Sequence, residues 1–384
     1  MSSQFSNAIL VTGKVDNHAH QALLAGLHEA FLDMGYTSQF FALNLDGSNI
    51  GEFLKAIEEA LAHKSDSTFV LDINGRMQLP QAAALKRVSF YIDHPCEHLE
   101  RLDAQGPHDI ITYLDPSHVA ALDALGFKQQ KMLLPHGGPE PGEMPPLEER
   151  DIDLLFSGRL EHSPRIADMR EGLADNPPIV QNIVLETAER VMAGEFLFEA
   201  FAAACETQSV HYTDFDRAGL GTAIVVADKF VRAHERHRLI TSIKTRKIHL
   251  IGHVDDGFFD KSPDNITFLG PKSFAEFEIY LPRTKILLNT AHVSPGGTHE
   301  RVWYGMAAGC VMATDPGELI EADFTHGENI LYWPKEVSSI EPMLSDILEN
   351  PSQGQAIVDA ATPIYTEQHT WSARAKHLDE ILNN

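Results

Sequence analysis

The segment 296–301 combines residue types that suit the binding of a phosphate group. Its glycine pair has no Cβ atoms, so an anion can approach the backbone closely. Thr298 is suited to cap a helix expected over 298–308, and the free amides and dipole of a first helical turn favour an anion. Arg301 would add a forked cation. The candidate anion-binding residues are Gly296, Gly297, Thr298, His299, Glu300 and Arg301.

The segment 90–98 holds the densest set of titratable groups near an expected strand end. Asp93 or His94 could act as a general base that removes a proton from a hydroxyl group. The structural alternative is that Asp93 caps the next turn and that His94 is held in place before a proline. With His98 these residues lack the ligand spacing of a metal site, so we predict no metal.

Four further segments carry candidate residues, each of which could equally be an ordinary surface turn or hinge. Gly158 and Arg159 follow one expected strand, and Gly252 follows another, where ligands bind in open α/β sheets. Candidate contacts elsewhere in the chain are Gly13, Lys14 and His136.

Strands must alternate with helices to bring these loops together. The hydrophobic pattern of the first half predicts strands at 8–12, 38–43, 68–73, 88–92, 110–113 and 131–134. It predicts helices at 20–34, 50–63, 80–86 and 116–125. This alternation indicates a parallel sheet with helices on both faces.

A segment rich in proline and glycine, 135–150, reads as an interdomain connection, after which the strand pattern restarts. Strands are expected at 153–157, 247–251, 265–269, 285–289 and 310–314. The segment 164–243 is helical in pattern, with helices at 179–193, 196–204 and 223–238, and is longer than a crossover requires.

The region from 285 to 315 resembles the C-terminal domain of nucleotide-sugar-dependent glycosyltransferases with the GT-B fold, particularly the bacterial "glycosyltransferase group 1" type related to spore-maturation proteins. The shared features are His299-Glu300-Arg301, then Met306-Ala307-Ala308-Gly309, then a strand that ends before Asp315. An aromatic residue before an Arg-Ala pair, Trp371 with Arg374-Ala375, resembles the closing helix of that family.

The resemblance implies an α/β fold of two Rossmann-like domains that face a cleft, with a helical insertion in the second. It places the acceptor-side domain at 1–146 and the nucleotide-sugar-binding domain at 147–365, including 164–243. Residues 366–384 would form a terminal helix that packs back towards the first domain.

The implied activity is transfer of a sugar from a nucleoside diphosphate sugar to an acceptor, without metal or cofactor. Arg301 would stabilise the departing diphosphate. The paired glutamates of better-known retaining relatives are replaced here by Gly296 and Tyr304, so a retaining outcome is not implied. Two alternatives stay open: a nucleotide-sugar epimerase of the same fold, and a noncatalytic nucleotide-sugar or protein-binding module.

Composition narrows the class of protein further. The chain has 384 residues, which suggests about two domains, and a formal charge of −25, which argues against nucleic acid or an anionic membrane as a partner. Its three cysteines are widely separated and predict no disulfide framework. Since we find neither a long apolar run nor a secretion signal, we expect a cytoplasmic protein.

Overall fold

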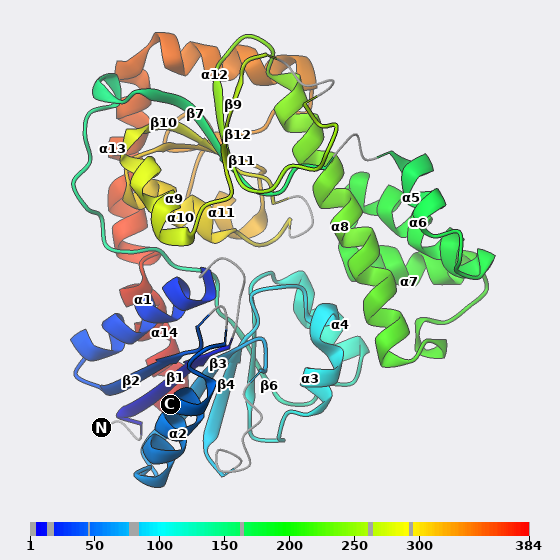
Figure 1. Cartoon of the computed structure of the whole chain (residues 1–384), viewed down its shortest axis with the longest axis vertical. Helices are drawn as coiled ribbons and strands as arrows, with labels where there is room; N and C mark the ends of the chain where they lie inside the picture. The colour runs from blue at the N-terminus through cyan, green and yellow to red at the C-terminus, as the bar shows by residue number, and fades with distance from the viewer. Residues whose placement is uncertain are drawn as a thin grey trace. The chain divides into compact units, whose positions relative to one another are not determined.

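The computed structural model describes residues 5–13, 19–44, 47–76, 84–161, 165–259, 264–291 and 295–383. The chain divides into two compact units (Figure 1). Unit 1 contains residues 1–140 together with 366–384, and unit 2 contains residues 141–365.

Unit 1 is built on a six-stranded sheet in the order β2-β1-β3-β4-β5-β6, and every pair of neighbours is parallel. The strands are β1 (Asn7–Thr12), β2 (Thr37–Ala42), β3 (Thr68–Ile73), β4 (Lys86–Phe90), β5 (Ile110–Tyr113) and β6 (Gln130–Leu133). The helices are α1 (Ala19–Asp33), α2 (Ile50–Ala62), η2 (Pro95–His98), α3 (Leu99–Asp103), α4 (Ser117–Ala124) and α14 (Trp371–Asn383).

The central strands of this sheet are buried on both faces, as parallel strands covered by helices should be. All six residues of β3 are buried. On one face, Ile9 and Val70 pack with Ile57 of α2. The first helix ends where Gly35 adopts a φ of 87°, a conformation that glycine reaches at little cost.

The C-terminal segment of unit 1 is fastened to the N-terminal part by packing and by hydrogen bonds. The indole of Trp371 fills the space where a side chain at Gly26 would lie, and α14 contacts α1. Gly138 pairs with Thr370 in a parallel bridge. At the far end of α14, the Phe5 amide donates to Asn383 Oδ1 at 2.7 Å.

Unit 2 also contains a six-stranded parallel sheet, in the order β12-β11-β10-β7-β8-β9. Its strands are β7 (Ile152–Ser157), β8 (Ile248–Ile251), β9 (Ile266–Gly270), β10 (Thr284–Leu288), β11 (Val311–Thr314) and β12 (Leu331–Tyr332). Its shorter helices are η3 (Leu147–Glu149), α9 (Phe274–Tyr280), η5 (Leu281–Arg283), α10 (Glu300–Ala307), α11 (Glu318–Glu321) and η6 (Val337–Ser339). Two more, α12 (Ile340–Glu349) and α13 (Pro351–Gln368), close the unit, and α13 runs into the segment assigned to unit 1.

A group of helices lies between β7 and β8 in the chain and to one side of the unit 2 sheet (Figure 1). Its members are α5 (Ile166–Gly172), α6 (Pro178–Met192), α7 (Leu197–Thr207), η4 (Tyr212–Asp214) and α8 (Arg217–Ser242). The long helix α8 contacts α6 and α7, while Leu239 and Ile240 near its end belong to the hydrophobic core of the sheet. The helix α8 thus joins the helical group to the sheet.

The α/β fold predicted from the sequence, with a parallel sheet in each half, is confirmed. The helix predicted at 80–86 needs correction at its end: residues 84 and 85 are not helical, and Lys86 begins β4 because it pairs with Phe69 of β3. The start of that predicted helix, residues 80–83, lies outside the described residues. Over the described part of the chain, no helix is both long and apolar enough to cross a membrane.

Candidate functional site

The carboxyl end of β10 in unit 2 is organised by a fully buried asparagine, Asn289. Its amide nitrogen Nδ2 donates to Thr314 Oγ1 at 2.9 Å, and its backbone oxygen accepts from Trp333 Nε1 at 2.7 Å. Its side-chain oxygen accepts from Arg301 Nη1 at 2.8 Å. Asn289 therefore fixes the Arg301 guanidinium relative to the strand ends.

Arg301 is only 7% exposed and lies in the first turn of α10. Its Nη2 lies 2.9 Å from His299 Nε2, while His299 Nδ1 lies 2.7 Å from Glu300 Oε2. Because Arg301 can only donate, Nε2 of His299 accepts its hydrogen bond. Nδ1 of His299 also lies 3.3 Å from the backbone N–H of Arg301, for which it is the acceptor. Burial lowers the pKa of Arg301; Glu300 opposes this shift, and Arg232 adds to it.

The N-terminal cap of α10 differs from the prediction. We expected Thr298 to cap the helix; instead, His299 occupies the capping position, with extended φ and ψ of −83° and 148°. The Thr298 hydroxyl is buried without a hydrogen-bond partner among the described residues, and Thr298 is 6% exposed. The helix begins at Glu300 because the chain is still extended at His299. Gly296 and Gly297 are also buried.

The loops after β7 and β8 come together at the same edge of the sheet, because those strands neighbour each other and β10. Gly158 donates its backbone N–H to Ile251 at 2.9 Å. Gly252 has a φ of 135°, and a Cβ atom there would overlap the Gly158 carbonyl oxygen. Arg159 is more exposed and forms ion pairs with Asp255 at 2.9 Å and with Glu161 at 3.6 Å. Gly252 is therefore required for this approach of the loops.

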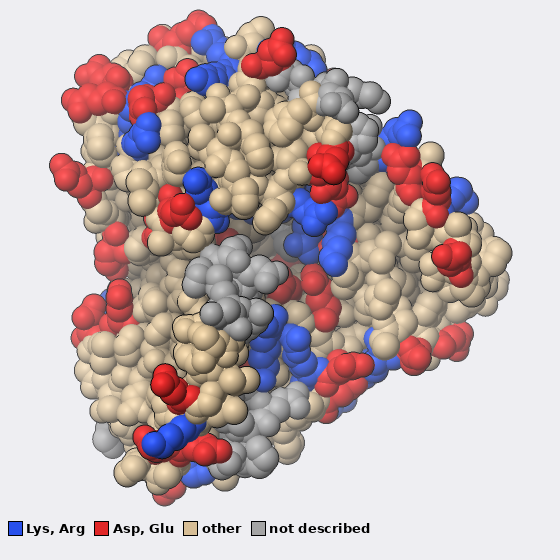
Figure 2. Space-filling view, in the orientation of Figure 1, with Lys and Arg blue, Asp and Glu red and all other residues tan. Residues whose placement is uncertain are grey.

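Two arginines of α8, Arg232 and Arg236, were not among the residues predicted from the sequence. Burial lowers the pKa of Arg236 to about 9, and the positive charges of Arg301 and Arg232 contribute to this shift. Figure 2 shows Lys and Arg side chains gathered over the middle of α8, with acidic side chains beside them. The spacing of the two arginines, one helical turn apart, was the available signal.

In unit 1, Asp93 lies just beyond the carboxyl end of β4 and accepts two hydrogen bonds. Asn74 Nδ2 donates to Asp93 Oδ2 at 2.8 Å, and His98 Nε2 lies 3.3 Å from the same oxygen. Arg101 Nη1 lies 3.3 Å from His98 Nδ1, which places the ring proton of His98 on the nitrogen that faces Asp93. The Asp93 side chain is 34% exposed, so the carboxylate is held in place yet accessible.

Asn74, a residue that the sequence did not single out, sits in the left-handed region with a φ of 56°. Its Oδ1 accepts from the Ile92 amide at 2.9 Å while its Nδ2 binds Asp93. A left-handed non-glycine residue costs free energy and occurs often at functional sites. The side chain of Asn74 thus ties the end of β3 to the segment that carries Asp93.

His94 is buried, and its Nδ1 accepts from the Cys96 amide at 3.2 Å. That bond leaves the proton of a neutral imidazole on Nε2, so His94 is suited to donate a hydrogen bond there and Asp93 is the better base. Its ring meets that of His118 edge to face, with centroids 4.6 Å apart. His118 is 1% exposed, and burial lowers its pKa to about 3 while Asp93 opposes the shift.

The structure describes two of the three other residues of unit 1 that were predicted to contact a ligand. Gly13 follows β1, where a Cβ atom would lie 3.7 Å from Arg76 Cδ. Lys14 lies outside the described residues. His136 is buried against Phe90, and its backbone oxygen accepts from Arg374 Nε at 2.9 Å. A contact between His136 and an acceptor stays a prediction.

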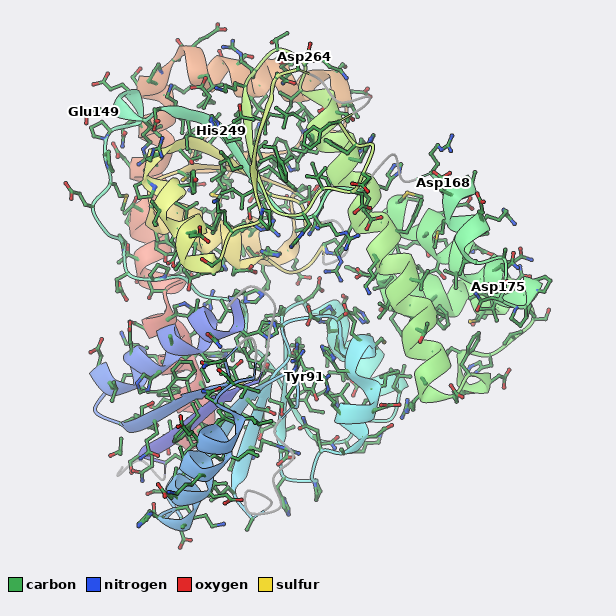
Figure 3. The ribbon with its side chains drawn as sticks, in the orientation of Figure 1. Tyr91, Glu149, Asp168, Asp175, His249 and Asp264 are labelled. Carbon is green, nitrogen blue, oxygen red and sulfur yellow. The ribbon has the colours of Figure 1, made fainter. Side chains whose placement is uncertain are left out.

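The packing beneath Asp93 depends on Tyr91, which lies at the end of β4 (Figure 3). Its hydroxyl accepts from Gln105 Nε2 at 2.9 Å, and burial raises its pKa. A Cβ atom at Gly75 would overlap this hydroxyl.

Within the described ranges, no three His, Cys, Asp or Glu side chains are grouped so that they could hold a metal ion.

Fold and site together define a class: an α/β protein with two parallel sheets, a carboxylate–histidine group at one sheet edge and buried arginines at the other. Residues 232–380 match a protein family described as "Glycosyl transferase-like". The predicted resemblance to group 1 GT-B glycosyltransferases is confirmed.

Solved structures of GT-B proteins match nearly the whole chain at low sequence identity. An α-glucosyltransferase in complex with UDP-glucose and DNA containing an abasic site matches with a TM-score of 0.57 and 9% identity over 98% of this chain and 99% of that one. Sucrose-phosphate synthase from Thermosynechococcus elongatus gives 0.53 and 13%, with 98% of each chain covered. Anabaena HepE in complex with UDP and glucose gives 0.50 and 12%, with coverage of 98% and 99%. No curated protein matches the sequence.

Proposed function

We propose that the chain transfers a sugar from a nucleoside diphosphate sugar to a hydroxyl group of an acceptor. The observation that carries this proposal is the buried Arg301 guanidinium, fixed by Asn289 and His299 at the start of α10. The buried hydroxyl of Thr298, which has no hydrogen-bond partner among the described residues, offers a donor to a ligand. Solved relatives in complex with UDP or UDP-glucose support a nucleotide sugar as the donor.

In the proposed reaction, the bond between the anomeric carbon and the diphosphate oxygen breaks, and the electron pair leaves with the diphosphate. Arg301 and the amides of the first turn of α10 stabilise that charge. The acceptor oxygen bonds to the anomeric carbon and loses its proton to Asp93. In this proposal arginine supplies the cationic charge, and neither a divalent metal nor a cofactor is invoked.

Asp93 suits the role of base because Asn74 and His98 hold one of its oxygens. Such preorganisation keeps the carboxylate in a fixed direction while the proton moves. His94, with its proton on Nε2, would donate a hydrogen bond to the acceptor rather than act as the base. Asp93 and His94 are thus given different tasks.

The first test is thermal-shift screening against UDP, GDP, ADP, TDP and CMP. A ligand at a hundredfold excess over its dissociation constant should stabilise the wild-type protein by about 2.7 kcal/mol. Arg301→Ala should abolish the shift given by the best nucleotide. Arg283→Ala is the matched control, since Arg283 lies in the same unit, half-exposed and paired with Asp151.

The outcomes separate the candidate functions. A nucleotide-specific shift that only Arg301→Ala removes supports a donor site, and incubation with the corresponding sugar nucleotide and varied acceptors then looks for transfer. Conversion of the donor without an acceptor would favour an epimerase. Binding without turnover would favour a noncatalytic module, and no shift at millimolar nucleotide would contradict the proposal.

A further inference from the structure

The helix α8 carries two arginines, Arg232 and Arg236, at the place where it leaves the helical group and enters the sheet core. Before them, Ala227 and Val231 are buried, and α8 contacts α6 and α7. After them, Leu239 joins the core of the sheet. Both arginines lie on one helix face, because residues four apart are neighbours on a helix surface.

The two arginines differ in how their charge is balanced. Arg232 Nε donates to Asp228 Oδ2 at 2.7 Å, and the Asp228 side chain is 2% exposed, so this pair is largely neutralised within the helix. Arg236 has no ion pair with a carboxylate of the described residues. Its Nη1 lies 3.5 Å from the Arg159 backbone oxygen, and its Nε is buried without a hydrogen-bond partner in the described part of the chain.

The burial and the neighbouring charges of Arg236 favour the binding of an anion beside it. Burial is the largest cause of the lowered pKa of Arg236; the positive charges of Arg301 and Arg232 lower it further, while the carboxylates of Asp228 and Glu161 oppose the shift. A buried cation with an unsatisfied donor costs free energy unless a partner arrives. An oxyanion that bridges Arg236 and Arg301 would supply that partner for both.

The position of Arg236 also fits a ligand at the strand ends. Its Cζ atom would lie 3.6 Å from a Cβ atom at Gly158, so the guanidinium rests against the loop that follows β7. That loop and the one before α10 follow neighbouring strands, at the sheet edge where open α/β sheets bind ligands. Arg236 and Arg301 therefore approach one place from two separate elements.

We propose that Arg236 is a second phosphate-binding residue of the donor site, and that it lets the site distinguish a nucleoside diphosphate from a monophosphate. The inference rests on the proposed function. It makes the helical group part of the donor site, because the helix that packs against α6 and α7 also supplies this cation.

The test compares the affinity of the wild-type protein, Arg236→Gln and Arg238→Gln for the best nucleoside diphosphate and for its monophosphate by isothermal titration calorimetry. Arg238 is the matched control, since it lies on the same helix and is paired with Glu235. Arg236→Gln should weaken diphosphate binding about tenfold or more, because a charge-assisted hydrogen bond is lost. It should leave monophosphate binding almost unchanged, and Arg238→Gln should leave both affinities unchanged.

Arg236→Lys provides a second variant that keeps the charge but loses the forked geometry, with an expected loss of diphosphate affinity of about threefold to tenfold. Diphosphate affinity at the wild-type level in both variants would overturn the inference, as would equal losses for diphosphate and monophosphate. If the wild-type protein binds no nucleoside diphosphate, the proposed function fails and the inference fails with it. If the wild-type protein binds and only Arg301→Ala weakens it, the function stands and the inference alone is wrong.

Discussion

The carboxyl edges of the two sheets hold groups of opposite character. In unit 1, the accessible charge is one carboxylate, Asp93, held by Asn74 and His98, with the neutral ring of His118 buried nearby. In unit 2, the buried Arg301 and the partly buried Arg236 lie close enough for their positive charges to interact. The first arrangement is suited to receive a proton, and the second to attract an anion. Two parallel sheets of six strands each thus carry different chemistry at their carboxyl edges.

The contrast is sharper because the protein as a whole is acidic, with a formal charge of −25. Long-range attraction of an anionic nucleotide is therefore weak or unfavourable, and binding depends on the local cations. Removing a single arginine should consequently affect nucleotide binding more than it would in a basic protein.

The largest expected effect comes from Asp93→Asn, which removes the base and keeps the shape of the side chain. Sugar transfer should fall by about 10²–10⁴-fold, the usual contribution of general base catalysis. The nucleotide affinity should not change, because Arg301 and its loop lie in unit 2. A coupled assay for the released nucleoside diphosphate measures the rate, and calorimetry measures the affinity.

The control for this variant is Asp123→Asn, which removes an exposed carboxylate of unit 1 that pairs with Lys131. It should retain wild-type transfer. A transfer rate for Asp93→Asn within threefold of wild type would show that the proton goes elsewhere.

A smaller effect is expected from Gly252→Ala, which changes the loop after β8 in unit 2, the unit that carries the arginines. The added Cβ atom would overlap the Gly158 carbonyl oxygen, and the φ of 135° is unfavourable for alanine. The free energy of unfolding of unit 2 should fall by about 2 kcal/mol or more, with weaker nucleotide binding. Urea denaturation with and without nucleotide measures both effects.

Gly172→Ala in α5 is the matched control, because a Cβ atom there meets nothing within 4 Å. That variant should be neutral or slightly stabilised, as alanine favours a helix. Equal stability of Gly252→Ala and wild type would mean that the two loops are not held as close as the structure places them.

The last effect is a pH dependence of unit 1 that is small just below pH 6.5 and grows as the pH falls. Since the pKa of His118 is lowered from 6.5 to about 3 in the folded protein, the unfolded state binds more protons between these values. The stabilisation is complete above pH 6.5 and is lost as the pH falls towards 3, at about 1.4 kcal/mol per pH unit. His369 adds a loss of the same sign, because burial and Arg374 lower its pKa to about 3.

Scanning calorimetry at pH 7.5 and pH 5.0 would detect this loss of stability, and His118→Leu should lose less on acidification than wild type. His63→Leu, which changes an exposed ring of unit 1, should behave as wild type. An identical acid response of wild type and His118→Leu would show that the buried ring does not stay neutral.

The sequence predicted the parts of the site that lie in short motifs directly after strands. Asp93, Gly158 and Arg301 could be singled out because apolar runs mark the strands that they follow, and their roles stay predictions. Arg232 and Arg236 were missed because arginines four residues apart on a long helix look like a solvated face. The prediction that Thr298 caps the helix was wrong. A preference of threonine for the capping position does not say where the helix begins, and the chain stays extended through His299.

Asn74 and His118 show a different limit of sequence reasoning. The two bonds that Asn74 makes depend on residues about twenty positions away, across the pairing of β3 with β4. His118 is buried only once α4 packs against η2. Long, strongly patterned elements such as β3 and α6 were predicted almost to the residue, since burial there follows the local pattern.

One feature of unit 1 bears on protein engineering. The bond between the Phe5 amide and Asn383 Oδ1 brings residues near the two ends of the chain side by side. A short flexible linker should therefore span them, and such proximity is what circular permutation requires. New ends opened at an exposed loop of unit 2 would leave unit 1 as one uninterrupted stretch of polypeptide, which could be expressed alone and studied by NMR.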